Sequence, residues 1–295
     1  MALLSLLGNK KRQYAILIAD QSNDNETWYV VQQFQKTYSN IFYFKPRISG
    51  KSNALNEAIS LTQSPIIAFT DDDCVASYDW IDTIVVTFEK NNGIDCITGN
   101  VYPYKTIPRW SCPPTLSTEY KIFARPIHHK CIGFGCNMAM RSSVLQSTGL
   151  FKSWLGPGSI STSCEDGDML LRLLLAGHKI LHNPNVIVYH TKQLTQSMII
   201  PQQMSYVCGE MACYGYYSLL GYTFAKKVVR KNIDDSIKKL RCVTGDLVKR
   251  RTLHTDLWIR AFSLLINRIR GFLIGFFYYI KACVFNIPDT SNGSD

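Results

Sequence analysis

The hydrophobic residues in the first two-thirds of the chain fall into short apolar runs separated by longer segments with one apolar side. Four runs predict strands, at residues 14–20, 41–44, 65–70 and 95–103. Between them, residues 27–38 and 49–63 predict helices. Strands that alternate with helices at this spacing predict an α/β domain with a largely parallel sheet.

A leucine-rich segment follows the flexible turn GPGS at residues 156–159 and predicts a helix that ends near Gly177. Glu165 and Asp166 stand in its first turn, directly after Cys164. Acidic side chains in a first turn are stabilised by the helix dipole, so a structural role explains this pair as well as a chemical role does. The pattern alone leaves both interpretations open.

Three consecutive aspartates, Asp71 to Asp73, follow the strand at 65–70. Adjacent carboxylates repel one another, and ionised groups beside apolar residues are costly unless a cation neutralises them. Magnesium or manganese would do so, because hard divalent ions favour carboxylate oxygens. A solvated loop that caps the next helix is the alternative, since aspartate is a good N-cap residue. In open α/β sheets, ligands bind beyond the carboxyl ends of strands; Asp20 ends another strand, which favours a metal and nucleotide site.

The net charge of +10 lies in the C-terminal part of the chain. Residues 221–281 hold 14 Lys and Arg against 4 Asp, which leaves 18 against 18 for the remainder. A nucleic-acid-binding protein can carry such a basic segment, but this segment is also rich in apolar residues. We therefore expect no nucleic-acid partner.

Cysteine usage and the N-terminus indicate the compartment. The ten cysteines include no C-x-x-C pair, which indicates reduced thiols in a cytosolic protein. The stretch HHKCIGFGC, from His128 to Cys136, fits no common zinc spacing, and we interpret its residues as core and loop.

The N-terminal MALLSLLGNKKR places apolar residues before charges, the reverse of a signal peptide. No uncharged apolar run reaches the ~20 residues that span a bilayer, so we expect neither secretion nor a conventional membrane span.

Two segments near the C-terminus predict helices, at residues 202–231 and 257–285. The first is rich in tyrosine, and we interpret it as packed against the preceding α/β domain. The second combines a wide aromatic and aliphatic face with basic residues, namely Arg260, Arg268, Arg270 and Lys281. Such a basic amphipathic helix is typical of an element that lies in a membrane interface. A helix packed on the domain core is the alternative.

Six stretches occur in a fixed order along the chain: YAILIADQSNDNET, GKSNALNEAI, IIAFTDDDC, GFGCNMAMRSSVLQSTGLF, CEDGDMLLRLLLAGHKI and PNVIVYH. In this order they resemble family 2 glycosyltransferases of the GT-A fold, over residues 1–190. The resemblance implies a Rossmann-like, mostly parallel mixed sheet flanked by helices. We predict a catalytic domain at residues 1–192, a helical membrane-associating region at 193–285 and a disordered tail at 286–295.

The resemblance also implies roles for single residues. Asp20 is similar to the aspartate that binds the nucleotide base, and Lys51 is similar to the basic residue that approaches the phosphates. Asp71 and Asp73 resemble the two ends of the D-x-D motif, which binds ribose and the metal that bridges the diphosphate. Asp72 occupies the variable middle position of that motif.

Asp166 resembles the catalytic base of the family, with Glu165 in a supporting or acceptor-binding role. His190 matches a position that often contributes to the metal or diphosphate site. The implied metal ligands are thus Asp71, Asp73 and His190, with Mn²⁺ or Mg²⁺ as cofactor. The chemistry agrees, because a diphosphate leaving group needs a cation and an acceptor hydroxyl needs a base.

One departure concerns the N-terminus. Members of the family normally begin with an apolar strand that ends in a Pro-Thr-Tyr-Asn-like stretch and helps to hold the nucleotide. Here MALLSLLGNKKR matches the end of the helix that follows that strand. We therefore expect a chain that starts one strand and most of a helix late, with one side of the base pocket absent.

We predict an inverting, metal-dependent glycosyltransferase that acts on a nucleotide-diphosphate sugar and on a glycan or lipid-linked acceptor. Its expected place is cytoplasmic and peripheral, at the inner face of the membrane. No Gln-x-x-Arg-Trp motif follows Asp166, which disfavours a polymerising synthase. A catalytically inactive transferase remnant that acts as a binding or scaffold protein is the alternative. A nucleotidyltransferase would need a Gly-rich phosphate loop near the N-terminus, and the sequence has none.

Overall fold

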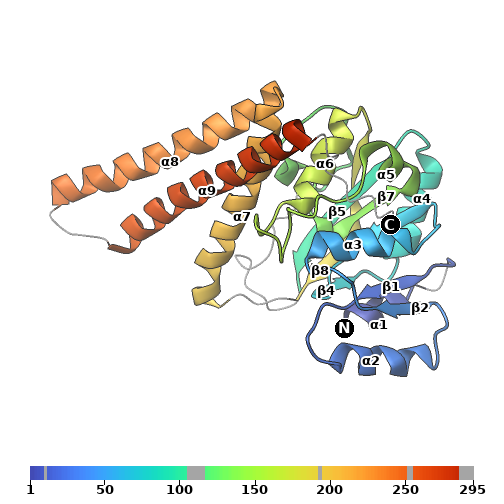
Figure 1. Cartoon of the computed structure of the whole chain (residues 1–295). Coiled ribbons are helices and arrows are strands. Elements are labelled where there is room, and N and C mark those ends of the chain that lie inside the picture. The colour runs from blue at the N-terminus through green and yellow to red at the C-terminus, as the bar shows by residue number, and fades with distance from the viewer. Residues whose placement is uncertain (10–11, 105–116, 192–194, 251–254, 286–295) are drawn as a thin grey trace. The chain divides into compact units, whose positions relative to one another are not determined.

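The computed structural model describes residues 1–9, 12–104, 117–191, 195–250 and 255–285 (Figure 1). The chain divides into two compact units. The first comprises Met1–Ser153 and Asp168–Gln193, and the second comprises Trp154–Gly167 and Leu194–Asp295. The predicted disordered tail at 286–295 lies outside the described residues, and the predicted domain boundary after residue 192 stays a prediction.

A parallel pair of strands, β1 (Ile16–Ala19) and β2 (Ile41–Phe44), opens the first unit, with Ile16 opposite Ile41. The pair packs with α1 (Ala2–Leu7) and α2 (Glu26–Gln35), as Figure 1 shows. Their small core consists of the buried residues Leu7, Ile16, Val31 and Ile41. Asp20 directly follows the last residue of β1.

The larger sheet of the first unit has the strand order β3–β7–β5–β8–β4, and β6 also pairs with β8. The strands are β3 (Ile66–Phe69), β4 (Cys74–Ala76), β5 (Cys96–Pro103), β6 (Lys121–Phe123), β7 (Met138–Arg141) and β8 (Ile180–His190). The β5–β8 ladder is parallel, whereas β3–β7, β5–β7, β4–β8 and β6–β8 are antiparallel. Hence β3, β5 and β8 run in one direction with β7 inserted against them. The predicted α/β class with a mixed sheet is confirmed.

Helices flank this sheet: α3 (Lys51–Ser60), α4 (Trp80–Lys90), α5 (Ser142–Thr148) and α6 (Glu165–Leu175). Leucines on one side of α6 are buried with Phe69 and Phe151, as the leucine pattern predicted. Asp168 of α6 is fully buried and forms a 2.8 Å salt bridge with Arg172 one turn later. Arg172 also donates to the carbonyls of residues 148–150, so this ion pair fixes α6 to the end of α5.

Three long helices form most of the second unit: α7 (Gln196–Leu219), α8 (Thr223–Arg250) and α9 (Thr255–Phe285). The segment 202–231 is helical as predicted but belongs to two helices, because the chain turns at Gly221, whose φ of 98° is left-handed. α9 approaches α7 closely where it has glycines. A Cβ on Gly271 would lie 2.2 Å from the Cys208 carbonyl oxygen, and one on Gly275 would lie 2.4 Å from that of Ala212. This backbone contact holds the helix pair together.

The two interpretations of the 257–285 segment each describe one side of α9. Ala261, Leu264 and Ile274 are buried, so the helix packs on its neighbours. Large apolar side chains elsewhere on α9 remain exposed, namely Leu257, Ile259, Phe262, Ile266, Ile269, Leu273, Phe276, Phe277, Ile280 and Val284. Leu257–Val284 has the length and composition of a membrane-crossing helix, a property that core helices of soluble proteins share, so the expectation of no conventional span stays a prediction. Interspersed arginines concealed this property from a search for uncharged runs.

Arg268 corrects one detail of the α9 prediction. Its side chain is buried rather than directed toward a membrane surface. It donates hydrogen bonds to the Asn232 carbonyl and to the Ser236 hydroxyl, both on α8. Burial lowers the pKa of Arg268, with Glu210 and Asp235 partly offsetting the effect. Arg268 therefore joins α9 to α8.

Candidate active site

The three aspartates lie on a tight turn between β3 and β4. The Cys74 amide donates to the Asp71 carbonyl at 3.1 Å, which closes the turn. The exposed Asp72 is at its tip, whereas Asp71 and Asp73 are half-buried. The turn thus separates the flanking carboxylates and gives each its own partner.

Lys51 is the partner of Asp71. Its Nζ lies 2.8 Å from Asp71 Oδ1, and both side chains are about one-third exposed, at 27% and 31%. Lys51 begins α3 because Gly50, with φ 111°, adopts a conformation that favours glycine just before the helix. The Gly50 amide donates to Gln21 Oε1 at 2.7 Å, which ties this helix start to the end of β1.

His190 is the neighbour of Asp73. It ends β8, directly opposite Cys74 in the antiparallel β4–β8 register. His190 Nε2 lies 3.6 Å from Asp73 Oδ1, and the Cys74 thiol lies 3.7 Å from the same oxygen. The amide and hydroxyl of Thr191 donate to the Asp73 carbonyl at 2.7 and 2.9 Å and hold the turn against β8.

The side chains of Asp73, Cys74 and His190 form a group that has the atoms to hold a metal ion. Their ligand atoms lie within 4.8 Å of one another. His190 Nδ1 is buried without a hydrogen-bond partner among the described residues, which is an incomplete arrangement for a neutral imidazole. Carboxylate oxygens suit Mg²⁺ and Mn²⁺, whereas imidazole nitrogen is a ligand of transition metals, so the pair suits Mn²⁺ better. The residues therefore fit the expected cation.

Cys74 is a member of this group that the sequence analysis missed. Its thiol is buried and also hydrogen-bonds with Cys136; that bond, and then burial, raise the pKa of the Cys136 thiol. The local signal was the position of Cys74 directly after Asp73 in the sequence. The pairing with His190 needs the β4–β8 register, which no local pattern contains.

Asp20 has a separate set of partners. The Ser22 amide donates to Oδ1 at 2.9 Å, and the Tyr43 hydroxyl donates to Oδ2 at 2.8 Å. Burial raises the pKa of Asp20, but the bonds from Ser22 and Tyr43 and the charge of Lys45 outweigh it, so the pKa is lowered. Burial and this bond to Asp20 raise the pKa of Tyr43 to about 12. Asp20 is therefore an ionised carboxylate that β1 and β2 hold in place.

Glu165 and Asp166 belong to the second compact unit and begin α6. Glu165 is buried, and Asp166 Oδ1 accepts a 2.7 Å hydrogen bond from the Gly167 amide. The residues before them are strained, with left-handed φ values of 68° at Thr162 and 76° at Cys164. Such strain in non-glycine residues collects at functional sites.

Contacts with α7 hold this strained loop. The Ser163 hydroxyl donates to the Ser205 carbonyl at 3.0 Å, and the Ser205 hydroxyl lies 2.9 Å from that of Thr162. The Cys164 thiol hydrogen-bonds with Cys213; this bond and burial raise the pKa of Cys164. The second unit thus fixes the backbone that leads into the Glu165–Asp166 pair.

The match to a family model decides the assignment. The model for glycosyl transferase family 2 matches residues 2–149, half of the chain. The chain belongs to glycosyl transferase family 2. The matched region includes Asp20, Lys51 and all three aspartates of the turn.

Individual relatives agree with this membership. Glycosyltransferase AglE of Haloferax volcanii is 26% identical over 154 residues, which cover 50% of this chain and 49% of the relative. The match thus spans about half the length of that curated protein. The fold is similar to that of a mannosyltransferase from Pyrobaculum calidifontis that was solved with GDP-Man and Mn²⁺. The TM-score is 0.59 at 13% sequence identity, and the match covers 92% of this chain and 81% of the mannosyltransferase. S. aureus TarS 1–349 is similar, with a TM-score of 0.58 at 14% identity over 92% and 78% of the two chains.

In this family 2 chain, the first compact unit therefore brings Lys51 to Asp71 and His190 to Asp73. It gives Asp20 partners of its own, Ser22 and Tyr43. In the stretch from His128 to Cys136, which the sequence analysis interpreted as core and loop, the rings of His128 and His129 stack on each other. The cysteines of the described residues are free thiols.

Proposed function

We propose that this chain transfers a sugar from a nucleoside-diphosphate donor to a hydroxyl of a glycan or lipid-linked acceptor. The observation that carries the proposal is the Asp71–Cys74 turn, where one carboxylate meets Lys51 and another meets His190. This arrangement collects cationic and metal-binding groups where a diphosphate would need them. Family membership supports the reaction class, and the mannosyltransferase of similar fold was solved with GDP-Man and Mn²⁺.

We assign a divalent cation, preferably Mn²⁺, to Asp73 and His190, with Asp71 as a further ligand. When bound, such an ion neutralises the charge that develops on a diphosphate leaving group. Lys51 supplies fixed positive charge beside it. Because Lys51 Nζ already meets Asp71, a bound phosphate would share this ammonium with the carboxylate.

Donor recognition is assigned to Asp20, Lys51 and Asp71. Asp20 stays ionised at neutral pH, and each of its oxygens has lone pairs beyond the one that accepts from Ser22 or Tyr43. It can therefore accept an N–H of a nucleotide base. Asp71 would accept from the ribose hydroxyls, at the same edge of the fold as Lys51.

Asp166 is the proposed general base, and Glu165 the group that binds the acceptor. As the acceptor oxygen bonds to the anomeric carbon, its proton passes to the Asp166 carboxylate, and the diphosphate leaves from the opposite face with its electron pair. A single displacement of this kind inverts the anomeric configuration. Asp166 Oδ1 accepts a hydrogen bond from the Gly167 amide, and the carboxylate has further lone pairs that can take this proton.

We propose a cytoplasmic, peripheral location at the inner face of the membrane. The exposed apolar residues Leu257, Ile259 and Phe262 of α9 and the basic excess of residues 221–281 support it. Apolar side chains inserted beside basic ones are typical of interfacial helices.

Nucleotide binding tests the proposal. We expect the purified full chain to bind GDP or UDP in Mn²⁺, and to lose most of that affinity in EDTA, as measured by isothermal titration. A Lys51→Met variant should weaken binding in Mn²⁺ because it removes the charge while keeping the length. A folded protein that binds neither nucleotide with or without Mn²⁺ would be a non-catalytic relative, and the proposal would then be wrong.

A further inference from the structure

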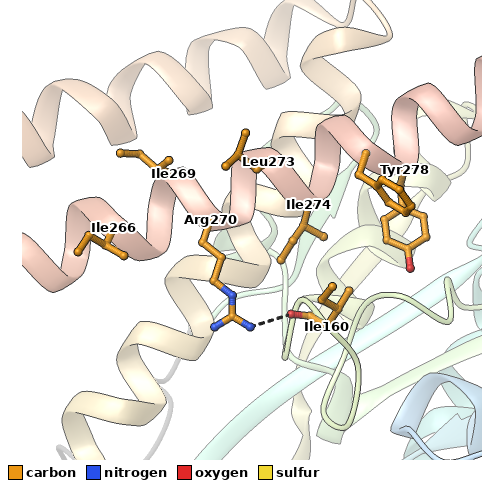
Figure 2. A pocket seen from close by; sticks show the side chains of 8 residues that line it. Ile160, Ile266, Ile269, Arg270, Leu273, Ile274 and Tyr278 are labelled. Atoms are coloured by element: carbon orange, nitrogen blue, oxygen red, sulfur yellow. Dashed lines mark hydrogen bonds between the residues drawn. The ribbon is translucent and has the colours of Figure 1, made fainter.

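An apolar cavity of about 500 Å³ lies within the second compact unit, between α9 and the loop that precedes α6 (Figure 2). Ile160 lines it from the loop. Successive turns of α9 supply Ile266, Ile269, Arg270, Leu273 and Phe277. The volume is within the roughly 300–1,000 Å³ that is typical of small-molecule sites.

Arg270 carries the only charge among the described residues that line the cavity. Its side chain points from α9 toward the loop, where Nη2 donates to the Ile160 carbonyl at 3.4 Å, a long hydrogen bond (Figure 2). Within the described parts of the chain, no carboxylate forms a salt bridge with it. A guanidinium is always protonated and has five N–H donors in a fork that fits phosphate. Arg270 can thus bind an anion at the cavity.

The apolar lining is elongated. Ile266, Ile269, Leu273 and Phe277 are 48–61% exposed and recur every three or four residues along α9. Phe277 lies eleven positions after Ile266 along the helix, a rise of about 16 Å. Large apolar side chains grouped on a surface mark a binding site, and this narrow stripe fits a linear hydrocarbon chain better than a compact ring.

We propose that this cavity binds a long-chain phosphate, with the hydrocarbon along Ile266, Ile269, Leu273 and Phe277 and the phosphate at Arg270. The charge of Arg270 selects an anionic head group, and the apolar stripe selects the chain. The occupant belongs to the lipid-linked acceptor class. This inference rests on the proposed function, in which a compound of this class is the acceptor. The cavity is near the proposed base in the sequence, because Ile160 lies in the loop that leads into Glu165 and Asp166. Binding itself is measurable without donor, metal or turnover.

Titration of the full chain with dodecyl phosphate, below the concentration at which it forms micelles, tests the site directly. Dodecyl maltoside has the same chain without the charge, and inorganic phosphate has the head group alone. We expect dodecyl phosphate to bind about tenfold more tightly than the maltoside, the worth of one charge-assisted contact, and inorganic phosphate not to bind measurably. Equal affinity for the two amphiphiles would overturn the role of Arg270.

Two matched pairs of variants locate the site on α9. Arg270→Leu should remove the preference for phosphate, whereas Arg260→Leu, an exposed arginine on the same helix outside the cavity, should keep it. Leu273→Ser should weaken dodecyl phosphate about tenfold or more, since it removes apolar contacts with the bound hydrocarbon chain. Ile259→Ser, at a comparably exposed position outside the cavity, should leave the affinity unchanged.

A bilayer surface is the competing explanation for the apolar stripe. In that case all four variants would bind dodecyl phosphate with the same affinity. Binding to vesicles of phosphatidylcholine and phosphatidylglycerol would also weaken equally in Arg260→Leu and Arg270→Leu. That pattern overturns the cavity proposal. Melting temperatures of the variants close to the parent's ensure that a lost affinity reports the site rather than the fold. Because nucleotide binding is measured separately, failure here is distinct from failure of the transferase proposal.

Discussion

The indole ring of Trp154 stacks on the ring of Tyr278, with centroids 4.4 Å apart and planes inclined by 10°. Trp154 begins the loop that leads to Glu165 and Asp166, and Tyr278 belongs to α9. The same indole lies 5.7 Å from the Tyr216 ring of α7. The C-terminal helices therefore hold the loop that carries the proposed base, in addition to any contact they make with a membrane.

Tyr278→Ala tests that coupling, with Tyr278→Phe as the matched control. The alanine variant should lose at least about 1 kcal/mol of unfolding free energy, because the ring stack is lost. Its sugar-transfer rate should fall while nucleotide affinity stays the same, since the loop lies outside the nucleotide-binding turn. The phenylalanine variant keeps the stack and should retain the rate. If both variants transfer sugar like the parent, the stack does not position the loop.

The metal assignment predicts different effects for neighbouring aspartates. Asp73→Asn should reduce Mn²⁺ affinity by more than the roughly 10–100-fold that follows loss of an outer-shell partner, as measured by the free-Mn²⁺ signal in electron paramagnetic resonance. Its stability should stay nearly constant, because the change removes repulsion in the metal-free protein. Asp72→Asn is the control, since Asp72 is exposed at the tip of the turn. Equal Mn²⁺ affinity in the two variants would contradict the D-x-D interpretation.

Asp166→Asn separates catalysis from helix capping. The amide keeps an oxygen for the Gly167 N–H but cannot take the acceptor's proton. Transfer should fall by about 10²–10⁴-fold, the usual contribution of general-base catalysis, with nucleotide binding and melting temperature unchanged. An unchanged transfer rate with a lower melting temperature would assign Asp166 to the helix start alone.

The bond between Tyr43 and Asp20 predicts a pH-dependent stability. The pKa of Asp20 is lowered, so its contribution is present above the ordinary carboxylate pKa and is lost as pH falls through the lowered value. The pKa of Tyr43 is raised to about 12, so its contribution is present below its ordinary pKa and is lost as pH rises through about 12.

Tyr43→Phe should therefore cost about 1.5 kcal/mol of unfolding free energy at pH 7, the worth of a hydrogen bond to a charged group. Urea denaturation at decreasing pH should show this difference shrinking as Asp20 becomes protonated. Tyr38→Phe is the control, because 37% of Tyr38 is exposed and a surface substitution changes stability by less than about 0.5 kcal/mol. A cost for Tyr43→Phe that does not change with pH would show that the hydroxyl contributes without the charge of Asp20.

Local patterns predicted the elements that carry their own hydrophobic signal. The strand at 41–44 and the helix that begins at Glu165 were placed correctly, since β-branched and aromatic runs and a leucine-rich face specify them locally. β4 and β6 were missed because each has three residues and exists through its pairing with β8. The break at Gly221 had a local signal in the glycine itself, but the helical pattern on both sides concealed it.

The candidate site divides in the same way. Asp20, Asp71 and Asp73 were found because each follows a strand, where open sheets bind ligands. The partners of those residues depend on contacts distant in sequence: Tyr43 reaches Asp20 through the β1–β2 register, and Cys74 faces His190 through β4–β8. Arg268 shows the same limit, since a helical periodicity cannot distinguish a side chain directed at α8 from one directed at solvent.

Arg260 and Arg268 together test the membrane proposal, because they lie on the same helix with opposite exposure. α9 packs on α7, so point substitutions are more informative than deletion of the helix, which would expose the buried face of α7.

Arg260→Gln should weaken binding to anionic vesicles about fivefold, which corresponds to about 1 kcal/mol for one basic residue near the surface. High salt should weaken binding of the parent without abolishing it, since salt screens the charges and leaves apolar insertion unaffected. Arg268→Gln should keep vesicle affinity but lose about 1–3 kcal/mol of stability, because Asn232 and Ser236 lose their donor. Co-sedimentation with vesicles and urea denaturation measure the two effects, and a parent chain that stays in the supernatant would exclude the interfacial role of α9.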